Sequence, residues 1–407
     1  MKCRHCAHEL HQSFVDLGVM PPSNAYLNHK SMFDDERSYP LKVLVCTHCW
    51  LVQTKDFTRA EELFTPDYAY FSSISSSWLH HAKRHVDRLI QERCLDSNSF
   101  VVELASNDGY LLQNFVQQRI PCLGVEPTAA SASVARDKGI EVKEDFFGLE
   151  IANVITEQYS KPDVIIANNV LAHVPDINDF VLGLAVLLSE NSVATLEFPH
   201  LLNLIELNQF DTIYHEHFSY LSLIAIENVF TKAGLKIFDV EKIATHGGSL
   251  RVWVQKKQGM EPIKPSVNIL LEEERRFGIE SLETYTSFTK QVDEVVQGLI
   301  DFLQNVKAEG KSIVAYGAAA KGNTLLNCAG VNQNDIQAVF DAAPSKQNKW
   351  LPGSHIPILA PHKLTEFKPD YVLILPWNIA DEIIPDIKEK VPEHCQFVVA
   401  VPEIKLL

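Results

Sequence analysis

Two pairs of cysteines near the start of the chain constrain its fold more than any other feature. Cys3 and Cys6 form one C-x-x-C turn, and Cys46 and Cys49 form a second. Two such turns brought together make a tetrahedral four-sulfur site, which suits Zn²⁺. The alternatives are two unrelated turns or a redox pair. Because a four-cysteine site has no open position, we expect structural zinc that stabilises a domain with little core of its own.

The charge balance argues against several partners. The 407-residue chain carries 52 acidic and 36 basic side chains, a formal net charge of −16. Such a surface repels phosphate backbones and anionic membranes, so we expect no nucleic-acid or membrane partner, which disfavours a zinc-ribbon DNA binder. No apolar run approaches membrane-spanning length, and the first residues lack a signal-peptide core. We therefore expect a cytoplasmic protein. We also expect it to be a monomer or a homodimer.

The chain divides into three segments of different character. Residues 1–65 hold the cysteine pairs and short alternating strands. Residues 66–255 alternate strand and helix patterns, which predicts a parallel doubly wound sheet. Residues 256–407 begin with long amphipathic helices and continue as a second, smaller strand series. We expect an α/β protein with a small zinc-binding domain, a central Rossmann-like domain and a second Rossmann-like domain. The predicted strands are 100–104, 122–125, 164–167, 192–198, 312–316, 336–341 and 371–375, and the predicted helices include 109–118, 129–138, 177–188, 270–277 and 285–306.

A loop of small and acidic residues follows the first central strand. It enters a helix at the place where a doubly wound sheet binds a nucleotide. The loop lacks G-x-G-x-x-G and contains Asp108, which would repel a pyrophosphate but attract the cationic groups of S-adenosylmethionine (SAM). Glu126 follows the next strand at the spacing of an acid that bonds ribose hydroxyls. This favours SAM over NAD; an ordinary turn with a chance acid is the alternative. The predicted cofactor-binding residues of this loop and of the following strand ends are Glu103, Ala105, Asn107, Asp108, Gly109, Glu126, Asp145, Phe146 and Asn168.

Titratable side chains are densest in the run Tyr214-His215-Glu216-His217, which follows the end of another predicted strand. An imidazole beside a carboxylate can make a general base with an orienting partner. The alternating His215 and His217 also resemble half a metal site, although no third ligand lies nearby in the sequence. A polar loop with an incidental histidine pair is the remaining interpretation.

Two further segments are candidates for substrate binding in the central part of the chain. His246 precedes two glycines that let the backbone approach a ligand, and Arg251 could hold an anion; a hairpin turn with an exposed arginine is the alternative. Tyr68 and Tyr70 lie at the junction of the first two segments. They could line a cleft or pack the interface.

The last segment repeats the strand-to-helix turn. Tyr316 ends a strand, and Lys321 and Asn323 follow at the start of a helix. A helix N-terminus with a lysine attracts an anion such as a diphosphate, so we predict that these residues contact the substrate. A vestigial nucleotide fold that only packs is the alternative.

These motifs resemble one family, the three-domain sugar C-methyltransferases of deoxysugar biosynthesis. The resemblance covers nearly the whole chain and rests on the cysteine pairs, ASNDGYLL at 105–112, YHEHFSY at 214–220, HGGSLR at 246–251, and YGAAAKGNTLLN at 316–327 followed by FD. It implies a central class I SAM-dependent methyltransferase domain, zinc on the cysteines, and methylation of C3 in a nucleotide-linked 4-keto sugar.

The resemblance also implies roles for the residues of the site. His217 would be the base, oriented by Glu216, and Tyr214 would steady an enolate oxygen. His173 and Tyr68 would face the same cavity, and the C-terminal domain would help hold the nucleotide-linked sugar. An imidazole base predicts that activity rises near a pKa of about 6.5. An NAD-dependent oxidoreductase and a non-catalytic, zinc-stabilised nucleotide-sugar-binding protein are the competing functions.

Overall fold

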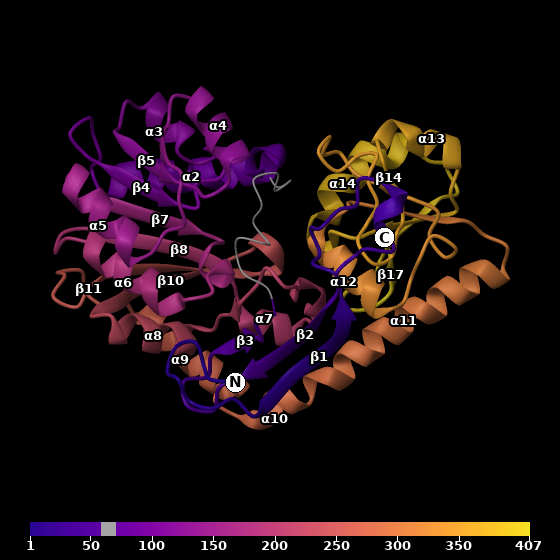
Figure 1. Ribbon diagram of the computed structural model, residues 1–407, viewed down its shortest axis with the longest axis horizontal. Coiled ribbons are helices and arrows are strands. Elements are labelled where there is room, and N and C mark those ends of the chain that lie inside the picture. The colour runs from indigo at the N-terminus through magenta and orange to yellow at the C-terminus, as the bar shows by residue number, and fades with distance from the viewer. Residues whose placement is uncertain (58–70) are drawn as a thin grey trace.

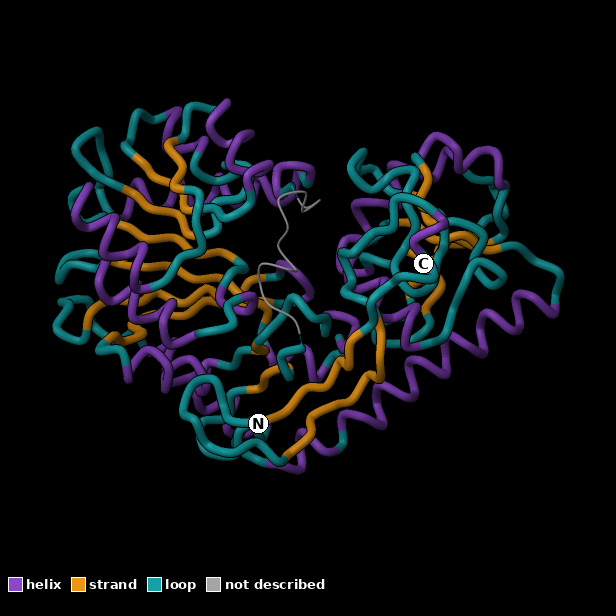
Figure 2. Tube along the Cα trace, viewed as in Figure 1, coloured by secondary structure: helices purple, strands orange, loops and turns teal. Residues whose placement is uncertain are grey.

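The computed structural model describes residues 1–57 and 71–407, and these contain three sheets. The central domain lies on one side and the C-terminal domain on the other, with the N-terminal strands and a long helix joining them below (Figure 1). Figure 2 shows that both flanking domains carry helices around their strands, whereas the N-terminal strands form a separate layer. This confirms the expected α/β fold class. The domain boundaries at 65 and 255 stay predictions.

The N-terminal sheet is antiparallel and is completed by a strand from the middle of the chain. Its order is β1-β2-β3-β9, so the short β9 pairs with β3 more than 160 residues away in sequence. The Phe14 ring of β1 stacks on Phe288 at 4.5 Å and meets the edge of Tyr285. These contacts give the small domain a core that it shares with the helices beneath it. The strands are β1 (Gln12–Met20), β2 (Tyr39–Val45), β3 (Val52–Thr54) and β9 (Ser219–Tyr220).

The central sheet has seven strands in the order β10-β11-β8-β7-β4-β5-β6. The strands from β8 to β6 run parallel, whereas β10 and β11 form an antiparallel hairpin at one edge. Every residue of β7 is buried, as expected for a parallel strand with helices on both faces. The strands are β4 (Val101–Leu104), β5 (Cys122–Val125), β6 (Glu141–Lys143), β7 (Val164–Asn168), β8 (Val193–Pro199), β10 (Leu235–Ile243) and β11 (Ser249–Lys256).

Helices of the central domain begin at recognisable caps. The Ser75 hydroxyl accepts a hydrogen bond from the Trp78 amide, and Asp176 caps α6 in the same way. The helix predicted at 109–118 begins only at residue 113, because residues 109–112 form turns. The helices are α2 (Ser76–Glu92), α3 (Gln113–Gln117), α4 (Ala129–Asp137), α5 (Leu149–Gln158), α6 (Ile177–Leu187), α7 (Leu201–Glu206) and α8 (Leu223–Lys232).

The C-terminal domain holds a six-stranded sheet in the order β14-β13-β12-β15-β16-β17, parallel except for β17. The predicted helix 285–306 is broken at Ser287, and the strand predicted at 336–341 forms only over Val339–Phe340. The strands are β12 (Ile313–Tyr316), β13 (Val339–Phe340), β14 (Ile358–Leu359), β15 (Tyr371–Ile374), β16 (Gln396–Val399) and β17 (Lys405–Leu406), and the helices are α9 (Pro265–Phe277), α10 (Leu282–Thr286), α11 (Phe288–Ala308), α12 (Ala320–Cys328), α13 (Leu364–Phe367) and α14 (Ala380–Ile387).

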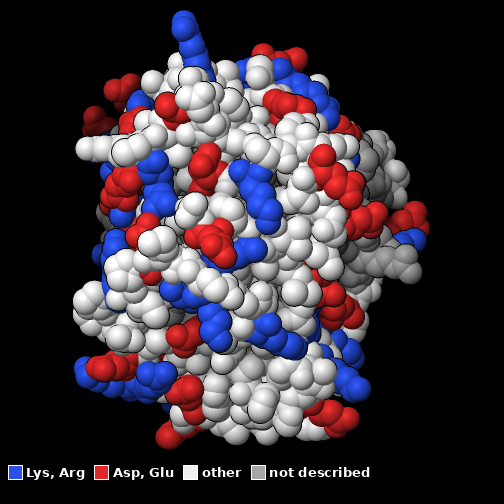
Figure 3. All heavy atoms as spheres, turned by 90° about the vertical axis from the view of Figure 1, so that its left-hand side faces the viewer, with Lys and Arg blue, Asp and Glu red and all other residues white. Residues whose placement is uncertain are grey.

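Acidic and basic side chains are interspersed over the face of the central domain that Figure 3 presents. Within residues 1–57 and 71–407, no helix combines the length and the apolar character that a bilayer crossing requires.

Candidate active site and zinc centre

The four predicted zinc cysteines lie together. Their Sγ atoms are all within 4.8 Å of one another, with Cys3 and Cys49 3.6 Å apart and Cys6 and Cys46 3.5 Å apart. The Gln53 Nε2 atom donates to the Cys3 sulfur at 3.2 Å. Four clustered thiols with an N–H donor beside them fit a tetrahedral Zn²⁺ with no open position. The geometry therefore suits a structural role.

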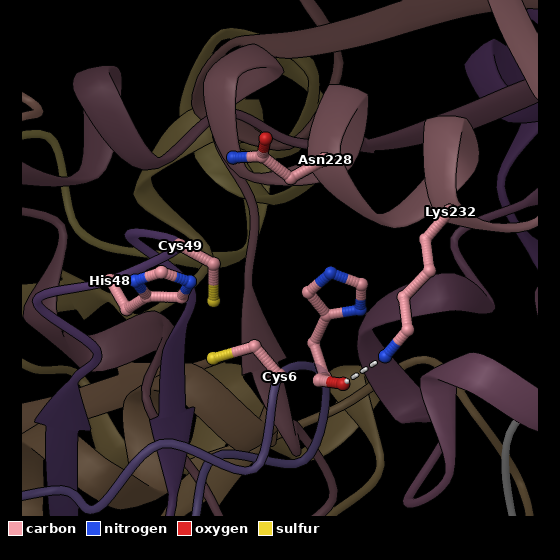
Figure 4. Close-up of a pocket in the computed structure, with 6 residues that line it drawn as sticks. Cys6, His48, Cys49, Asn228 and Lys232 are labelled. Carbon is pink, nitrogen blue, oxygen red and sulfur yellow. Dashed lines mark hydrogen bonds between the residues drawn. The ribbon is translucent and has the colours of Figure 1, made fainter.

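A hollow of about 310 Å³ lies beside the cysteines. Figure 4 shows Cys6 and Cys49 on one side of it and the α8 side chains Asn228 and Lys232 on the other. Lys232 Nζ donates to the His5 carbonyl at 3.2 Å, and His5 Nδ1 lies 2.8 Å from Asn178 Oδ1. The zinc turn is thus docked on the central domain through several polar contacts.

The loop after β4 turns on residues with left-handed backbone angles. Ala105, Asn107 and Gly109 have φ values of 55°, 49° and 75°. Only glycine suits position 109, because a Cβ there would lie 2.3 Å from the Ile140 side chain. The Asp108 side chain is buried, and its Oδ1 has no hydrogen-bond partner among the residues that the structure describes.

Two buried glutamates complete the predicted cofactor site. Burial raises the pKa of Glu103 well above its usual value, although the Tyr110 side chain opposes the shift. Burial also raises the pKa of Glu126, whose Oε2 accepts from the Asn107 amide at 3.0 Å and whose Oε1 accepts from the Thr128 amide at 2.9 Å. A nearby positive charge lowers the pKa of buried carboxyl groups, so a ligand with positive charge and hydroxyl donors would favour their ionised, hydrogen-bond-accepting form. SAM has both.

The remaining predicted cofactor residues lie at the same edge of the sheet. Asn168 ends β7, is buried, and lies within 3.5 Å of the Tyr110 hydroxyl through its Nδ2 atom. Asp145 and Phe146 follow β6 and are exposed, with the Phe146 ring 40% accessible. An exposed aromatic ring at this position is available to cover an adenine.

His217 is held as a buried, neutral imidazole. It lies between η4 (Phe210–Thr212) and β9, and its Nδ1 is 2.8 Å from the Thr212 carbonyl oxygen. Because a carbonyl only accepts, Nδ1 carries the ring proton and Nε2 keeps the lone pair. Burial lowers the pKa of His217 well below its usual value, and the neighbouring His173 adds to the shift. The ring also packs against Tyr214, with centroids 4.0 Å apart.

His173 shares this environment. It ends η3 (Leu171–His173), its ring centroid is 4.6 Å from that of His217, and its Nδ1 is 2.8 Å from the Glu216 carbonyl oxygen. Burial lowers the pKa of His173 to about 4. Two neutral imidazoles and the Tyr214 phenol ring therefore meet at one place.

Glu216 lies differently from what the sequence analysis expected. Its Oε1 accepts from the backbone and side-chain nitrogens of Asn24 at 3.2 and 3.0 Å, and Oε2 has no partner among the described residues. Burial raises the pKa of Glu216 above its usual value. The group that orients His217 is the Thr212 carbonyl and not this carboxylate, because backbone geometry places the carbonyl on Nδ1.

The HGGSLR segment forms the turn of the β10/β11 hairpin. His246 lies in η5 (Thr245–Gly247), where Asn169 Nδ2 donates to its Nε2 at 3.1 Å, and burial lowers its pKa to about 4. Arg251 is buried rather than exposed, and its Nε donates to Glu197 at 2.7 Å. Glu197 also contacts His81 at 2.8 Å. Arg251 is thus engaged in an ion pair with Glu197, and its role in substrate binding stays a prediction.

The C-terminal residues approach the site from α12. Lys321 Nζ donates to Asn378 Oδ1 at 2.6 Å and lies 4.9 Å from the Trp377 ring. Asn323 is fully buried, and its side-chain atoms have no partner within the described part of the chain. Tyr316 ends β12, and burial raises its pKa to about 12. Tyr68 and Tyr70 lie outside the described residues.

Sequence reasoning missed three residues that connect the domains at this site, namely Asn24, Asp211 and Trp377. Asn24 holds Glu216, and Trp377 Nε1 donates to Asp211 Oδ2 at 2.7 Å, next to the Thr212 carbonyl. No local pattern marks these residues, because their partners lie far away in the chain.

Comparison with known proteins covers the whole chain. Family models match residues 3–64 as a zinc binding domain, residues 78–240 as a methyltransferase domain and residues 244–402 as a C-methyltransferase C-terminal domain. C-methyltransferase NovU of Streptomyces niveus is 34% identical over 406 residues, which span 100% of this chain and 96% of NovU. The chain belongs to the C-methyltransferase family.

This C-methyltransferase is therefore a SAM-dependent enzyme with a zinc-binding N-terminus, as the sequence predicted, and the NAD-dependent alternative is set aside. Solved structures with similarity include magnesium protoporphyrin IX methyltransferase from Synechocystis PCC 6803 with bound SAM (15% identity, 44% of this chain, 79% of that chain, TM-score 0.34). Another is a SAM-dependent methyltransferase from Clostridium acetobutylicum ATCC 824 (14% identity, 45% of this chain, 92% of that chain, TM-score 0.36).

Proposed function

We propose that this C-methyltransferase adds a methyl group to C3 of a nucleotide-linked 4-keto-deoxysugar through an enolate. The observation that carries the proposal is the buried His217, whose Nδ1 proton is held by the Thr212 carbonyl at 2.8 Å so that Nε2 is the basic atom. Carbon is a poor nucleophile unless it first loses a proton. A carbon beside a ketone loses one readily, because the enolate oxygen takes the charge.

The residues around His217 suit the separate parts of this step. His217 Nε2 removes the C3 proton, and the electron pair moves to the C4 oxygen. The Tyr214 ring lies against His217, and its hydroxyl is the donor that we assign to the developing enolate oxygen. Glu216 Oε2 is an acceptor for a sugar hydroxyl, because Asn24 occupies only its Oε1.

The cofactor and the nucleotide would be held by different domains. Glu103, Asp108 and Glu126 would hold SAM, which when bound supplies an electrophilic methyl group for the C3 carbanion. Lys321 and Asn323, at the start of α12, would hold the diphosphate and the sugar on the other side of the site. Holding both partners close supplies much of the rate acceleration.

The test is mass spectrometry of the enzyme with SAM and a panel of nucleotide-linked 4-keto-deoxysugars, in water and in deuterium oxide. We expect one sugar to gain a single methyl group while S-adenosylhomocysteine is released. We also expect solvent deuterium to enter C3 when S-adenosylhomocysteine replaces SAM. Methylation without any exchangeable C3 proton, or methyl transfer to oxygen, would refute the enolate step.

A further inference from the structure

We propose that Arg4, which stands between the first two zinc cysteines, positions the two active-site histidines. The inference rests on the proposed roles of His217 and His173. It extends the function of the N-terminal domain, because the zinc turn then contributes to the chemistry of the central domain as well as to its own folding.

Arg4 is not a free surface cation. Its side chain is only 6% exposed, and its guanidinium spans three acceptors. One terminal nitrogen donates to the Pro175 carbonyl at 2.6 Å. The other donates to the Thr54 carbonyl at 3.0 Å and to Asp56 Oδ1 at 2.8 Å. A planar guanidinium can bridge acceptors in this way, whereas a lysine ammonium cannot reach all of them from one position.

The acceptors and the neighbouring ring lead directly to the histidines. Pro175 lies two residues after His173. The guanidinium carbon of Arg4 lies 5.5 Å from the centre of the Phe218 ring, and Phe218 follows His217 in the chain. The Phe218 amide in turn donates to the Ala172 carbonyl at 2.8 Å. Arg4 therefore touches both segments at the point where they are joined.

The strand next to Arg4 makes a second connection. Thr54 Oγ1 donates to the His217 carbonyl at 3.1 Å, and the Thr54 amide donates to the Phe218 carbonyl at 3.1 Å. Thr54 ends β3, which pairs with β9, and β9 begins two residues after His217. Because Arg4 binds the Thr54 carbonyl, it also fixes the strand that supports the His217 backbone.

The zinc turn holds the other end of Arg4. The Arg4 amide donates to Gln53 Oε1 at 2.9 Å, and Gln53 Nε2 donates to the Cys3 sulfur at 3.2 Å. Asn178 Nδ2 donates to the Arg4 carbonyl at 3.0 Å. Ligation of Cys3 and Cys6 by zinc would therefore fix the backbone from which the guanidinium reaches the site. Thr47, the equivalent residue of the second turn, is exposed.

The experiment compares Arg4→Met with Arg4→Lys, and uses Thr47→Ala as the matched control in the second zinc turn. Four quantities are measured on the full chain: zinc content by atomic absorption, SAM affinity by calorimetry, kcat and KM for the methylated sugar, and hydrogen exchange in residues 171–176 and 214–220. In the control, all four should stay within about twofold of the wild-type values.

For Arg4→Met we expect unchanged zinc content and SAM affinity, and a kcat about 10- to 100-fold lower, because small misplacements of catalytic groups are costly. KM should change less than kcat, and both histidine segments should exchange faster. Arg4→Lys retains one donor group, so it should recover part of the kcat that Arg4→Met loses. If Arg4→Met folds poorly, Arg4→Lys serves as the test instead. A kcat within twofold of wild type in Arg4→Met, or zinc loss in parallel with kcat, would overturn the proposal. If the wild type methylates no sugar, the proposed function fails, and the exchange rates alone decide whether Arg4 orders the two segments.

Discussion

His217→Asn should separate the chemistry from the fold. The His217 Nδ1 hydrogen bond to the Thr212 carbonyl is 2.8 Å long. An asparagine amide has a nitrogen at the same position along the side chain, so the variant keeps a donor for that carbonyl. It has no basic atom in place of Nε2. The substitution thus removes the proposed base and preserves the contact that orients the segment.

The size of both effects follows from the surroundings of the ring. A positioned general base contributes about 10²- to 10⁴-fold, so kcat should fall by that factor. The variant also loses the ring contacts with Tyr214 and His173, at 4.0 and 4.6 Å. At about 0.5–1.5 kcal/mol for each aromatic pair, the loss is small beside a folding free energy of roughly 5–15 kcal/mol. The chain should therefore stay folded.

The assay is turnover, together with deuterium entry at C3 and calorimetric titration with SAM. We expect both rates to fall together while SAM affinity stays within about twofold, because Glu103 and Glu126 lie on other strand ends. His215→Asn is the matched control, since its Nε2 contacts the Tyr39 carbonyl instead. If His217→Asn keeps turnover within tenfold of wild type, or keeps deuterium entry at C3, His217 is not the base.

Four further outcomes follow from the structure. In the pH profile of kcat, the midpoint of the acid limb should lie below about pH 6.5, because burial lowers the pKa of His217. A midpoint above that value would contradict the assignment of a neutral, buried imidazole as the base. Glu126→Ala should weaken SAM binding by about tenfold or more in calorimetry, since its carboxylate also orders the β4 loop through Asn107. Cys46→Ser should lower both bound zinc and the midpoint of thermal unfolding; an unchanged midpoint would mean that zinc adds no stability. Burial lowers the pKa of His85 to about 3, so the unfolded chain binds the extra proton between about pH 6.5 and 3, and stability should fall by roughly 1.4 kcal/mol per pH unit as the pH drops through that window. The check is urea titration at several pH values. In His85→Gln, the slope of unfolding free energy against pH should be lower by the contribution of one proton, about 1.4 kcal/mol per pH unit.

Local patterns were enough to predict most of the central sheet. The strand predicted at 122–125 forms as β5, and the strand predicted at 192–198 is shifted by one residue. Apolar runs of this kind are buried on both faces wherever helices flank them, so neighbouring residues already carry the signal. The cysteine pairs also carry a local signal, because each C-x-x-C turn places two zinc ligands close together in the sequence.

Other elements could not be found from local spacing. The helix predicted from Gly109 starts four residues later, because the left-handed residues at 105, 107 and 109 prolong the turn. The β10/β11 hairpin was foreseen only as an alternative for the turn at 246–251, because the second segment was interpreted as strand-helix alternation. In the structure β11 pairs with both β10 and β8.

The sequence by itself determined which residue types are present: four thiols that suit zinc, acids at strand ends that suit a cationic cofactor, and a histidine cluster to which we assign proton transfer. Only the tertiary structure decided which atoms meet. Asn24 reaches Glu216 across 192 residues, and Asp211 reaches Trp377 across 166 residues. The group that orients His217 is a backbone carbonyl, which every residue possesses. Residue type and spacing cannot distinguish one backbone carbonyl from another. The direction of the Thr212 carbonyl is set by packing across three domains.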